Sequence, residues 1–144
     1  MKISAKERAG LRAMVEFARH YGKGPISLRQ VAQAEALPLP YLEQIVLDLR
    51  RAGLLTSVRG PRGGYLLARD PATLSVGDIF RAVEGELMSV NCTRTDGSPC
   101  ARESFCATRS IWQTVFLRVT ETLDRTFLAD LLRDAEPAIP TKGC

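Results

Sequence analysis

The chain has 144 residues, 45% of them hydrophobic, which is enough to bury one ordinary core but not two independent ones. Its formal net charge is +4. No apolar run approaches the ~20 residues of a membrane span, and the opening stretch MKISAKERAG lacks the apolar segment of a signal peptide. These features exclude a membrane-spanning protein and predict a cytoplasmic one, with a single domain plus an extension.

The charge is unevenly distributed along the chain. Residues 1–70 contain 12 Lys/Arg against 6 Asp/Glu, a net charge of +6, whereas residues 71–144 contain 8 against 10, a net charge of −2. A basic front half favours contact with a polyanion such as nucleic acid, although a solvated basic surface would give the same count.

Three helices are predicted first, over about residues 5–21, 28–36 and 40–52. Ser4 can cap the first helix, and Ser27 and Gln30 stand at capping-box spacing at the start of the second. Pro40 suits the first position of the third helix, and Gly53 ends it. Apolar residues recur at helical spacing in the first and third helices, so each of these should have one inner face.

Two short strands and two further helices follow. The strands LLTSV and GYLLA flank the tight, basic turn RGPRG, which predicts a β-hairpin, and Ser75 can cap the helix SVGDIFRAVEGE. After a loop, apolar residues recur every four positions from Ile111 to Leu131. They predict one helix from Thr108 to Asp134, roughly 40 Å long at ~1.5 Å per residue. Because such a helix exceeds a small core, its stripe should pair with the same helix of a second subunit.

Three helices followed by a β-hairpin is the order of a winged helix-turn-helix domain, in which the third helix enters the major groove. The predicted fold is therefore mainly α with a small β-wing, plus a long C-terminal dimerisation helix. Tyr41, Glu43 and Gln44 point away from the apolar face of the third helix. Glutamate can accept from cytosine N4 and glutamine can pair with adenine, so these side chains can read bases. An ordinary polar helix face would show the same pattern.

Basic residues complete the predicted DNA surface. Arg59, on a tight Gly-Pro turn, can enter a narrow minor groove, and Arg62 adds a second charge at the tip of the hairpin. Phosphate contacts, which position a protein without specifying sequence, are predicted for Lys2, Lys6, Arg8, Arg50 and Arg51.

Three of the four cysteines stand in one loop-like segment, NCTRTDGSPCARESFCATRS. In a reducing cytosol, clustered cysteines more often bind metal or perform redox chemistry than form structural disulfides. Cys92, Cys100 and Cys106 are separated by seven and five residues, a looser spacing than the tight pairs of zinc fingers. A zinc ion bound by these cysteines is one reading of this loop, and unligated surface cysteines are another. Cys144, beyond two prolines, is interpreted as a free thiol.

Several of these motifs resemble those of a known family. PLPYLEQIVLDLRRAGLLTSVRGPRGGYLLARD, LSVGDIFRAVEGE and the cysteines before the last helix are similar to the Rrf2 family of bacterial winged-helix regulators. Within it, they resemble the iron-sulfur regulators of the IscR type. The resemblance extends from Met1 to about Leu132. It implies that Glu43 reads bases, that Arg59 enters the minor groove, and that the long helix forms the homodimer.

The resemblance also implies that the three cysteines of the loop hold an iron-sulfur cluster, for which thiolates are the usual ligands. The IscR-type pattern has a histidine three residues after the last cysteine, where Arg109 stands here and offers no lone pair. Relatives that sense nitric oxide take a carboxylate from the first helix. Glu7 is therefore predicted as the fourth ligand, with Glu103 second and an external thiol or water third. Mixed ligation favours a [2Fe-2S] over a [4Fe-4S] cluster.

Together these features predict a homodimeric transcription regulator, a repressor on a palindromic operator, whose iron-sulfur cluster senses iron, redox state or nitric oxide. The predicted parts are a DNA-binding domain (1–85), a cysteine loop (86–107), a dimerisation helix (108–134) and a flexible tail (135–144). A cluster-free regulator of the same fold, sensing a metabolite or a partner protein, and a zinc-binding regulator are the alternatives. An enzyme is not expected, because the sole histidine, His20, has no nucleophile or paired carboxylates at catalytic spacing.

Overall fold

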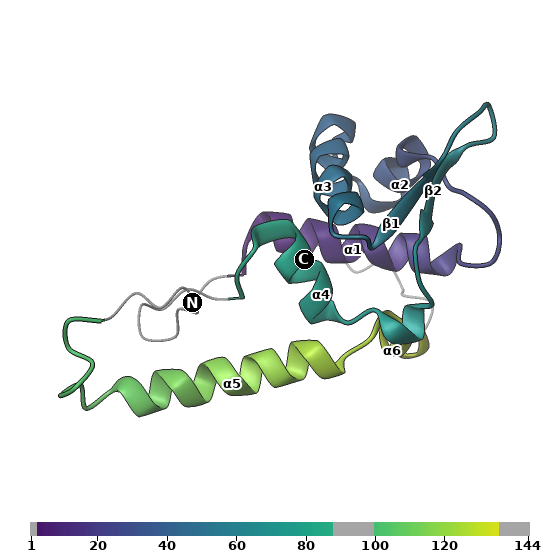
Figure 1. Cartoon of the computed structure of the whole chain (residues 1–144). Coiled ribbons are helices and arrows are strands. Elements are labelled where there is room, and N and C mark those ends of the chain that lie inside the picture. The colour runs from purple at the N-terminus through teal and green to yellow at the C-terminus, as the bar shows by residue number, and fades with distance from the viewer. Residues whose placement is uncertain (1–2, 88–99, 136–144) are drawn as a thin grey trace.

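The computed structural model describes residues 3–87 and 100–135 of the chain. They form mainly helices, with one two-stranded sheet (Figure 1): α1 (Ala5–Arg19), α2 (Leu28–Glu35), α3 (Leu39–Arg51), β1 (Leu55–Val58), β2 (Gly64–Leu67), the 3-10 helix η1 (Pro71–Thr73), α4 (Val76–Glu84), α5 (Arg109–Arg125) and α6 (Leu128–Asp134). The predicted mainly α architecture with a small β-wing is confirmed. Within the two described ranges, no helix is both long and apolar enough to cross a bilayer.

Polar residues set the starts of α1, α2 and α4. At α1, the Glu7 N–H donates to Ser4 Oγ at 3.0 Å, and the Ser4 N–H donates back to Glu7 Oε2 at 2.6 Å. This reciprocal capping satisfies backbone donors that the first turn of a helix leaves unpaired. The same box pairs Ser27 with Gln30 at α2 and Ser75 with Asp78 at α4.

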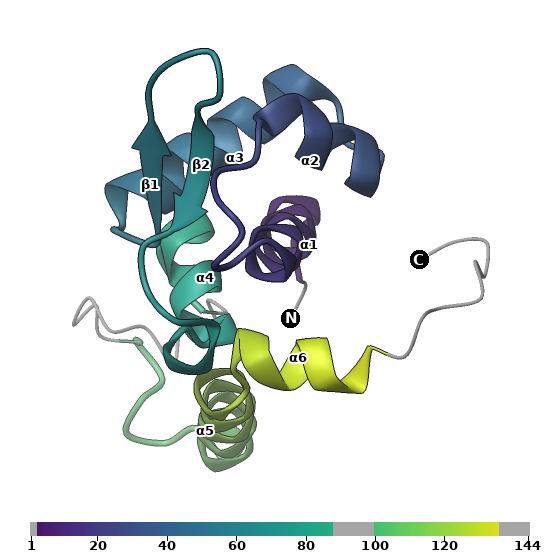
Figure 2. The same ribbon diagram turned by 90° about the vertical axis from the view of Figure 1, so that its right-hand side faces the viewer.

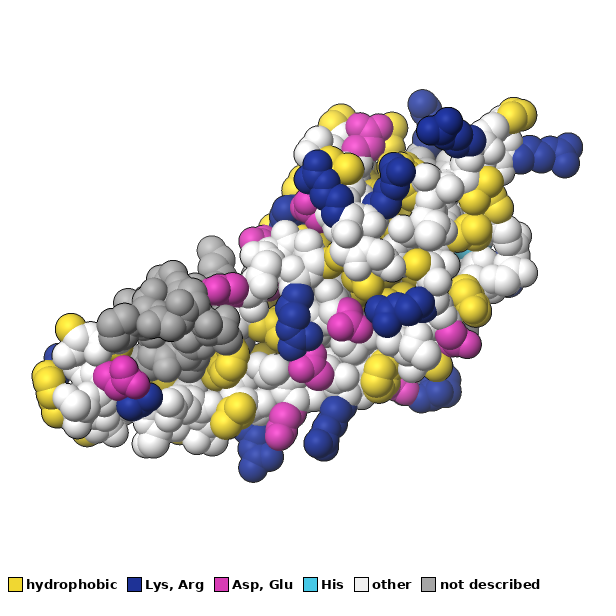
Figure 3. All heavy atoms as spheres, viewed as in Figure 1, with side chains coloured by type: hydrophobic (Ala, Val, Ile, Leu, Met, Phe, Trp, Pro, Cys, Tyr) yellow, Lys and Arg dark blue, Asp and Glu magenta, His cyan; other side chains and the backbone are white. Residues whose placement is uncertain are grey.

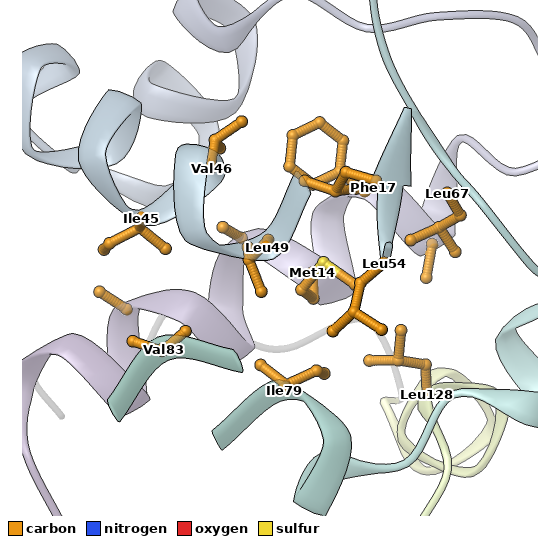
Figure 4. Close-up of a cluster of buried hydrophobic side chains, with 14 of the residues drawn as sticks. Met14, Phe17, Ile45, Val46, Leu49, Leu54, Leu67, Ile79, Val83 and Leu128 are labelled. Atoms are coloured by element: carbon orange, nitrogen blue, oxygen red, sulfur yellow. The ribbon is translucent and has the colours of Figure 1, made fainter. Parts of the chain in front are cut away.

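The core is centred on α1, which contacts α2, α3, α4 and α6. Figure 4 shows Met14 and Phe17 of α1 among side chains from α3, α4 and α6. Leu49 of α3, Ile79 of α4 and Leu128 of α6 are fully buried. Because the apolar residues of a helix at i, i+3 and i+4 share one face, each of these helices turns that face inward and leaves the other to solvent. The outward face of α3 is thereby presented by a rigid body.

The wing is an antiparallel hairpin in which β1 and β2 pair from Leu55 with Leu67 to Val58 with Gly64. Near the turn, β2 is held by a further bridge between Tyr65 and Ile26. Gly64 has a φ of +156°, and a Cβ there would overlap the Ile26 backbone, so only glycine allows this close approach. The turn between the two strands projects away from the helices (Figure 1).

The single helix predicted from Thr108 to Asp134 is wrong, because the chain breaks into α5 and α6 at Thr126 and Phe127. Phe127 is extended and bridges to Ser75 ahead of α4. The break carries α6 across beneath α1 (Figure 2) and buries Leu128 completely in the core. A straight helix would have carried Leu128 away from α1 into solvent, so tertiary burial overrides the helical periodicity here.

Candidate nucleic-acid interface and cysteine loop

The outward face of α3 carries the side chains predicted to read bases. Glu43, Gln44 and Arg50 are exposed, whereas the inward leucine, isoleucine and valine side chains of the helix are buried in the core. Tyr41 is half-buried and packs against that core, so only part of its ring reaches solvent. α3 begins after Pro38 without a side-chain cap. The arrangement gives a rigid helix whose polar side is open for contact.

Lys6, predicted to contact phosphate, is held inside the domain. Its ammonium lies 2.8 Å from the Asp48 carboxylate of α3 and donates to the Val83 carbonyl of α4 at 3.0 Å. Lys6 thus joins α1, α3 and α4, and a DNA phosphate would compete with Asp48 for it. The phosphate contact stays a prediction, next to a structural role that the sequence did not indicate.

The wing carries two further basic residues at its tip. Arg59 and Arg62 are exposed on the turn between β1 and β2, where the Gly63 N–H donates to the Gly60 carbonyl at 3.0 Å. Gly60 has a φ of +111°, which glycine adopts without strain. Figure 3 shows basic side chains over the end of the molecule formed by α3 and the wing. This end combines positive charge with a protruding hairpin, as contact with a nucleic-acid backbone requires.

The cysteine loop runs directly into α5. Cys100 and Cys106 are both free and partly exposed, whereas Cys92 lies outside the described residues. Cys106 Sγ lies 3.4 Å from Thr108 Oγ1. Hydrogen bonding from the Thr108 hydroxyl and backbone, with a smaller contribution from the charge of Arg102, lowers the pKa of the Cys106 thiol. Since thiolates are the form that ligates iron, the lowered pKa suits Cys106 to the predicted role, and cluster ligation by Cys100 and Cys106 stays a prediction.

Both carboxylates predicted as fourth ligands already have partners. Glu7 is buried in the capping box of α1, and Glu103 pairs with Arg109 at the start of α5. Within residues 3–87 and 100–135, no three His, Cys, Asp or Glu side chains come together as a metal site. The described residues therefore bring together neither Glu7 nor Glu103 with the two thiols, and their ligation stays a prediction.

Comparison with known proteins decides the family. Residues 3–134 match the model of the Rrf2 family, described as an iron-dependent transcriptional regulator. The chain belongs to the Rrf2 family. Among Rrf2 relatives, CymR of Bacillus subtilis is 44% identical over 131 residues, which cover 91% of this chain and 89% of CymR. IscR of Vibrio vulnificus is 37% identical over 137 residues, covering 94% and 80%.

Solved Rrf2-family structures have the same fold. IscR of T. potens superposes with a TM-score of 0.78 at 43% identity, covering 99% of this chain and 94% of that one. CymR of B. subtilis, the global cysteine regulator of that organism, also gives 0.78, at 41% identity and with 94% and 99% covered. The predicted winged-helix regulator is thereby confirmed, and the chain is a transcriptional regulator rather than an enzyme.

Two features of this Rrf2 protein escaped the sequence analysis. Leu47 is 38% exposed on the outward face of α3, where only polar side chains had been considered. Arg81 of α4 and Asp124 of α5 form a bidentate pair with both distances at 2.8 Å. Helical spacing from Glu43 could have revealed Leu47, but nothing local in the sequence marks a pair 43 residues apart.

Proposed function

We propose that the protein is an iron-sulfur cluster-dependent repressor that binds a palindromic operator as a homodimer. The observation that carries this proposal is the placing of Cys100 and Cys106 on a loop that runs straight into α5. With Cys92 they would hold the cluster, as [2Fe-2S], and Glu7 is the proposed fourth ligand. The naming of close relatives as IscR supports the cluster.

The dimer would form through α5. None of the residues of this helix is buried, and Ile111, which is 53% exposed, lies on one face with Val115 and Val119 at four-residue spacing. Apolar side chains gathered on one face of a surface helix favour contact with another apolar surface. An identical α5 from a second subunit gives a closed, two-fold symmetric contact and places two α3 helices for the two halves of a palindrome.

In the proposed complex, Glu43 and Gln44 read bases in the major groove, together with Tyr41. Arg59 enters the minor groove from the wing, and Arg62 adds a phosphate contact at the tip. Lys6 and Arg50 contribute phosphate contacts from α1 and α3. Exposure of the α3 and wing residues supports these roles, since base edges are reached only by side chains that stand clear of the core.

Signal transmission would follow covalent and packed connections from the loop to α3. When bound, the cluster would supply the sensitivity to iron, redox state or nitric oxide. The loop ends at α5, which Arg81 and Asp124 tie to α4, and α4 packs on both α1 and α3. A change in the loop would therefore alter how α5 positions the two reading helices, shifting the population that fits the operator.

Anaerobic purification of the full chain tests the cluster directly. We expect iron and sulfide in equal amounts, with absorption and Mössbauer spectra of a [2Fe-2S] cluster. Cys92→Ala, Cys100→Ala and Cys106→Ala should each lose most of the iron, whereas the control Cys144→Ala should keep it. Intact cluster spectra in all three loop variants would refute this ligand set, and stoichiometric zinc without iron would establish the zinc-binding alternative.

A test of Glu7 as the fourth ligand requires a variant that preserves the capping box of α1. Glu7→Gln removes the carboxylate yet keeps a side chain that can complete a capping box, so folding should be retained. If Glu7 ligates iron, Glu7→Gln should shift the spectrum and shorten the cluster lifetime in air, and Glu103→Gln should do neither. Wild-type behaviour of both variants would leave an external thiol or water as the donor.

A cluster-free regulator is the second candidate, favoured by one observation. The CymR relative is 44% identical, and CymR is named for cysteine regulation. In this case, the variant lacking all three loop cysteines would bind the operator as tightly as the wild type, under air as well as without it.

A further inference from the structure

Leu47 lies in the middle of the outward face of α3. At ~100° per residue, it falls between Glu43 and Gln44, about 40° and 60° away from them around the helix axis. One turn further along, Arg50 and Arg51 flank it in the same way. Leu47 is 38% exposed, although the helix already buries four apolar residues on its other side. An apolar side chain thus stands at the centre of an otherwise polar and charged surface.

The chemistry of Leu47 restricts what it can contact. A leucine side chain neither donates nor accepts hydrogen bonds, so it gains free energy only by removing an apolar surface from water. The floor of the DNA major groove offers one such surface, the C5-methyl group of thymine, and apolar side chains contact that methyl group. No other standard DNA base presents a methyl group there.

We propose that Leu47 packs against a thymine methyl group and so specifies thymine within the operator half-site. This inference rests on the proposed entry of α3 into the major groove. Glu43 stands one turn before Leu47, and Arg50 follows it, so the thymine should lie beside the base pair that Glu43 reads. The arrangement gives two adjacent specificities by different means, a hydrogen bond from cytosine N4 to the Glu43 carboxylate and a methyl contact to Leu47.

Replacing thymine by deoxyuridine tests the contact, because it removes only the methyl group. A duplex selected by the full-length protein from a random pool would carry deoxyuridine at one thymine position at a time, with binding measured at fixed salt. One position in each half-site should weaken wild-type binding about fourfold, the effect of burying one methyl group. Leu47→Ala should bind the thymine and deoxyuridine duplexes equally.

Two further variants separate this contact from general effects. Leu47→Met keeps an apolar side chain and should keep most of the discrimination, whereas Tyr21→Ala, which removes a more exposed apolar side chain beyond the end of α1, should behave as the wild type. Should Leu47→Ala bind too weakly to measure, Leu47→Met and Leu47→Val supply the comparison.

The possible failures are distinguishable. If the protein enriches no sequence from the pool, base reading by α3 fails, and this inference with it. If it enriches a sequence but no thymine position is sensitive, or if Leu47→Ala discriminates as the wild type does, only the methyl contact is overturned. Insensitivity of every thymine would leave Leu47 as a contact for a protein partner.

Discussion

The winged-helix body, α1–α4 with β1 and β2, and the helix α5 differ in how they satisfy their apolar residues. Each helix of the body buries at least one apolar side chain in a shared core, and Met14, Leu42 and Leu49 have no exposed surface. α5 is the longest helix described, and it buries none of its residues. The body therefore shares one core, which α6 completes through Leu128, whereas α5 depends on surfaces outside that core for much of its stabilisation.

The two regions are nevertheless joined at both ends of one short element, α4. Near its start, Val76 N–H donates to the Thr126 carbonyl at 2.9 Å, and the Leu128 N–H donates to the Leu74 carbonyl at 2.9 Å. Toward the end of α4, the Arg81 guanidinium donates to both carboxylate oxygens of Asp124. α5 is thus anchored at its C-terminal end, while its N-terminal end meets the cysteine loop. In the proposed mechanism, this geometry would let a change in the loop reach the winged-helix body through α5.

The largest contrast should appear in matched leucine truncations. Leu49→Ala removes a fully buried side chain of α3 and should lower the free energy of unfolding by about 2–5 kcal/mol, through lost burial and a cavity. Leu117→Ala on α5 should change it by less than about 0.5 kcal/mol, because that side chain is 59% exposed and lies about 120° around the helix from Ile111 of the proposed dimer face. Chemical denaturation of both variants measures the difference. Equal destabilisation would show that α5 is as integral to the core as α3.

The next contrast concerns binding rather than stability. Arg59→Ala should weaken specific operator binding by about 1–3 kcal/mol at fixed salt, the scale of a base-reading contact, without changing the melting temperature. Arg118→Ala removes the same charge from the exposed surface of α5, and should have little effect on operator affinity. Equal losses in the two variants would mean that Arg59 acts only through net charge.

The ion pair between Arg81 of α4 and Asp124 of α5 can be disrupted by a substitution in either helix. Asp124→Ala should cost at most about 1 kcal/mol of stability, because the pair with Arg81 is well exposed. A Cβ at Gly77 would overlap the Asp124 carboxylate, so Gly77→Ala should displace the same group, offset by a gain in helix propensity of about 1 kcal/mol. Both should speed hydrogen exchange of the α5 amides.

The double variant, which carries both Gly77→Ala and Asp124→Ala, shows whether the two substitutions act through the same contact. If both substitutions act by breaking the ion pair between Arg81 and Asp124, the α5 amides of the double variant should exchange no faster than those of Asp124→Ala alone. Glu121→Ala, which removes a carboxylate that pairs with Arg118 of the same helix, should leave exchange unchanged. Additive acceleration would show that Gly77 and Asp124 act independently.

Short-range patterns in the sequence predicted most of the winged-helix body. The capping pairs begun by Ser4, Ser27 and Ser75 all form, because their partners lie three residues away on the same helix. The break at Phe127 could not be predicted in this way, since it depends on hydrogen bonds to residues before α4, some 50 positions earlier, and on the space available for Leu128.

The features of the candidate site also divide into those set by local patterns and those set by long-range packing. The exposure of Glu43, Gln44 and Arg59 followed from helix and hairpin periodicity alone. The partners of Lys6 and Glu103 did not, because a charged residue's neighbours depend on how helices pack. Sequence reasoning therefore predicted which of these side chains are exposed better than it predicted the partners of the charged ones.

The smallest expected effect lies at the junction of the loop and α5, and it concerns the acidity of the Cys106 thiol. Hydrogen bonding to Thr108 lowers the pKa of Cys106, so its thiolate forms, and reacts with iodoacetamide, at a lower pH than an unassisted thiol. Thr108→Val removes the hydroxyl but keeps the backbone N–H, so the reactivity curve of Cys106 should move part of the way to higher pH. Mass spectrometry of cluster-free protein can follow this cysteine separately from the other three. Thr114→Val, which removes a hydroxyl that donates within α5 to the Ser110 carbonyl, should leave the curve in place. Coincident curves for Thr108→Val and the wild type would show that the hydroxyl does not stabilise the thiolate, and that the backbone and Arg102 set its acidity.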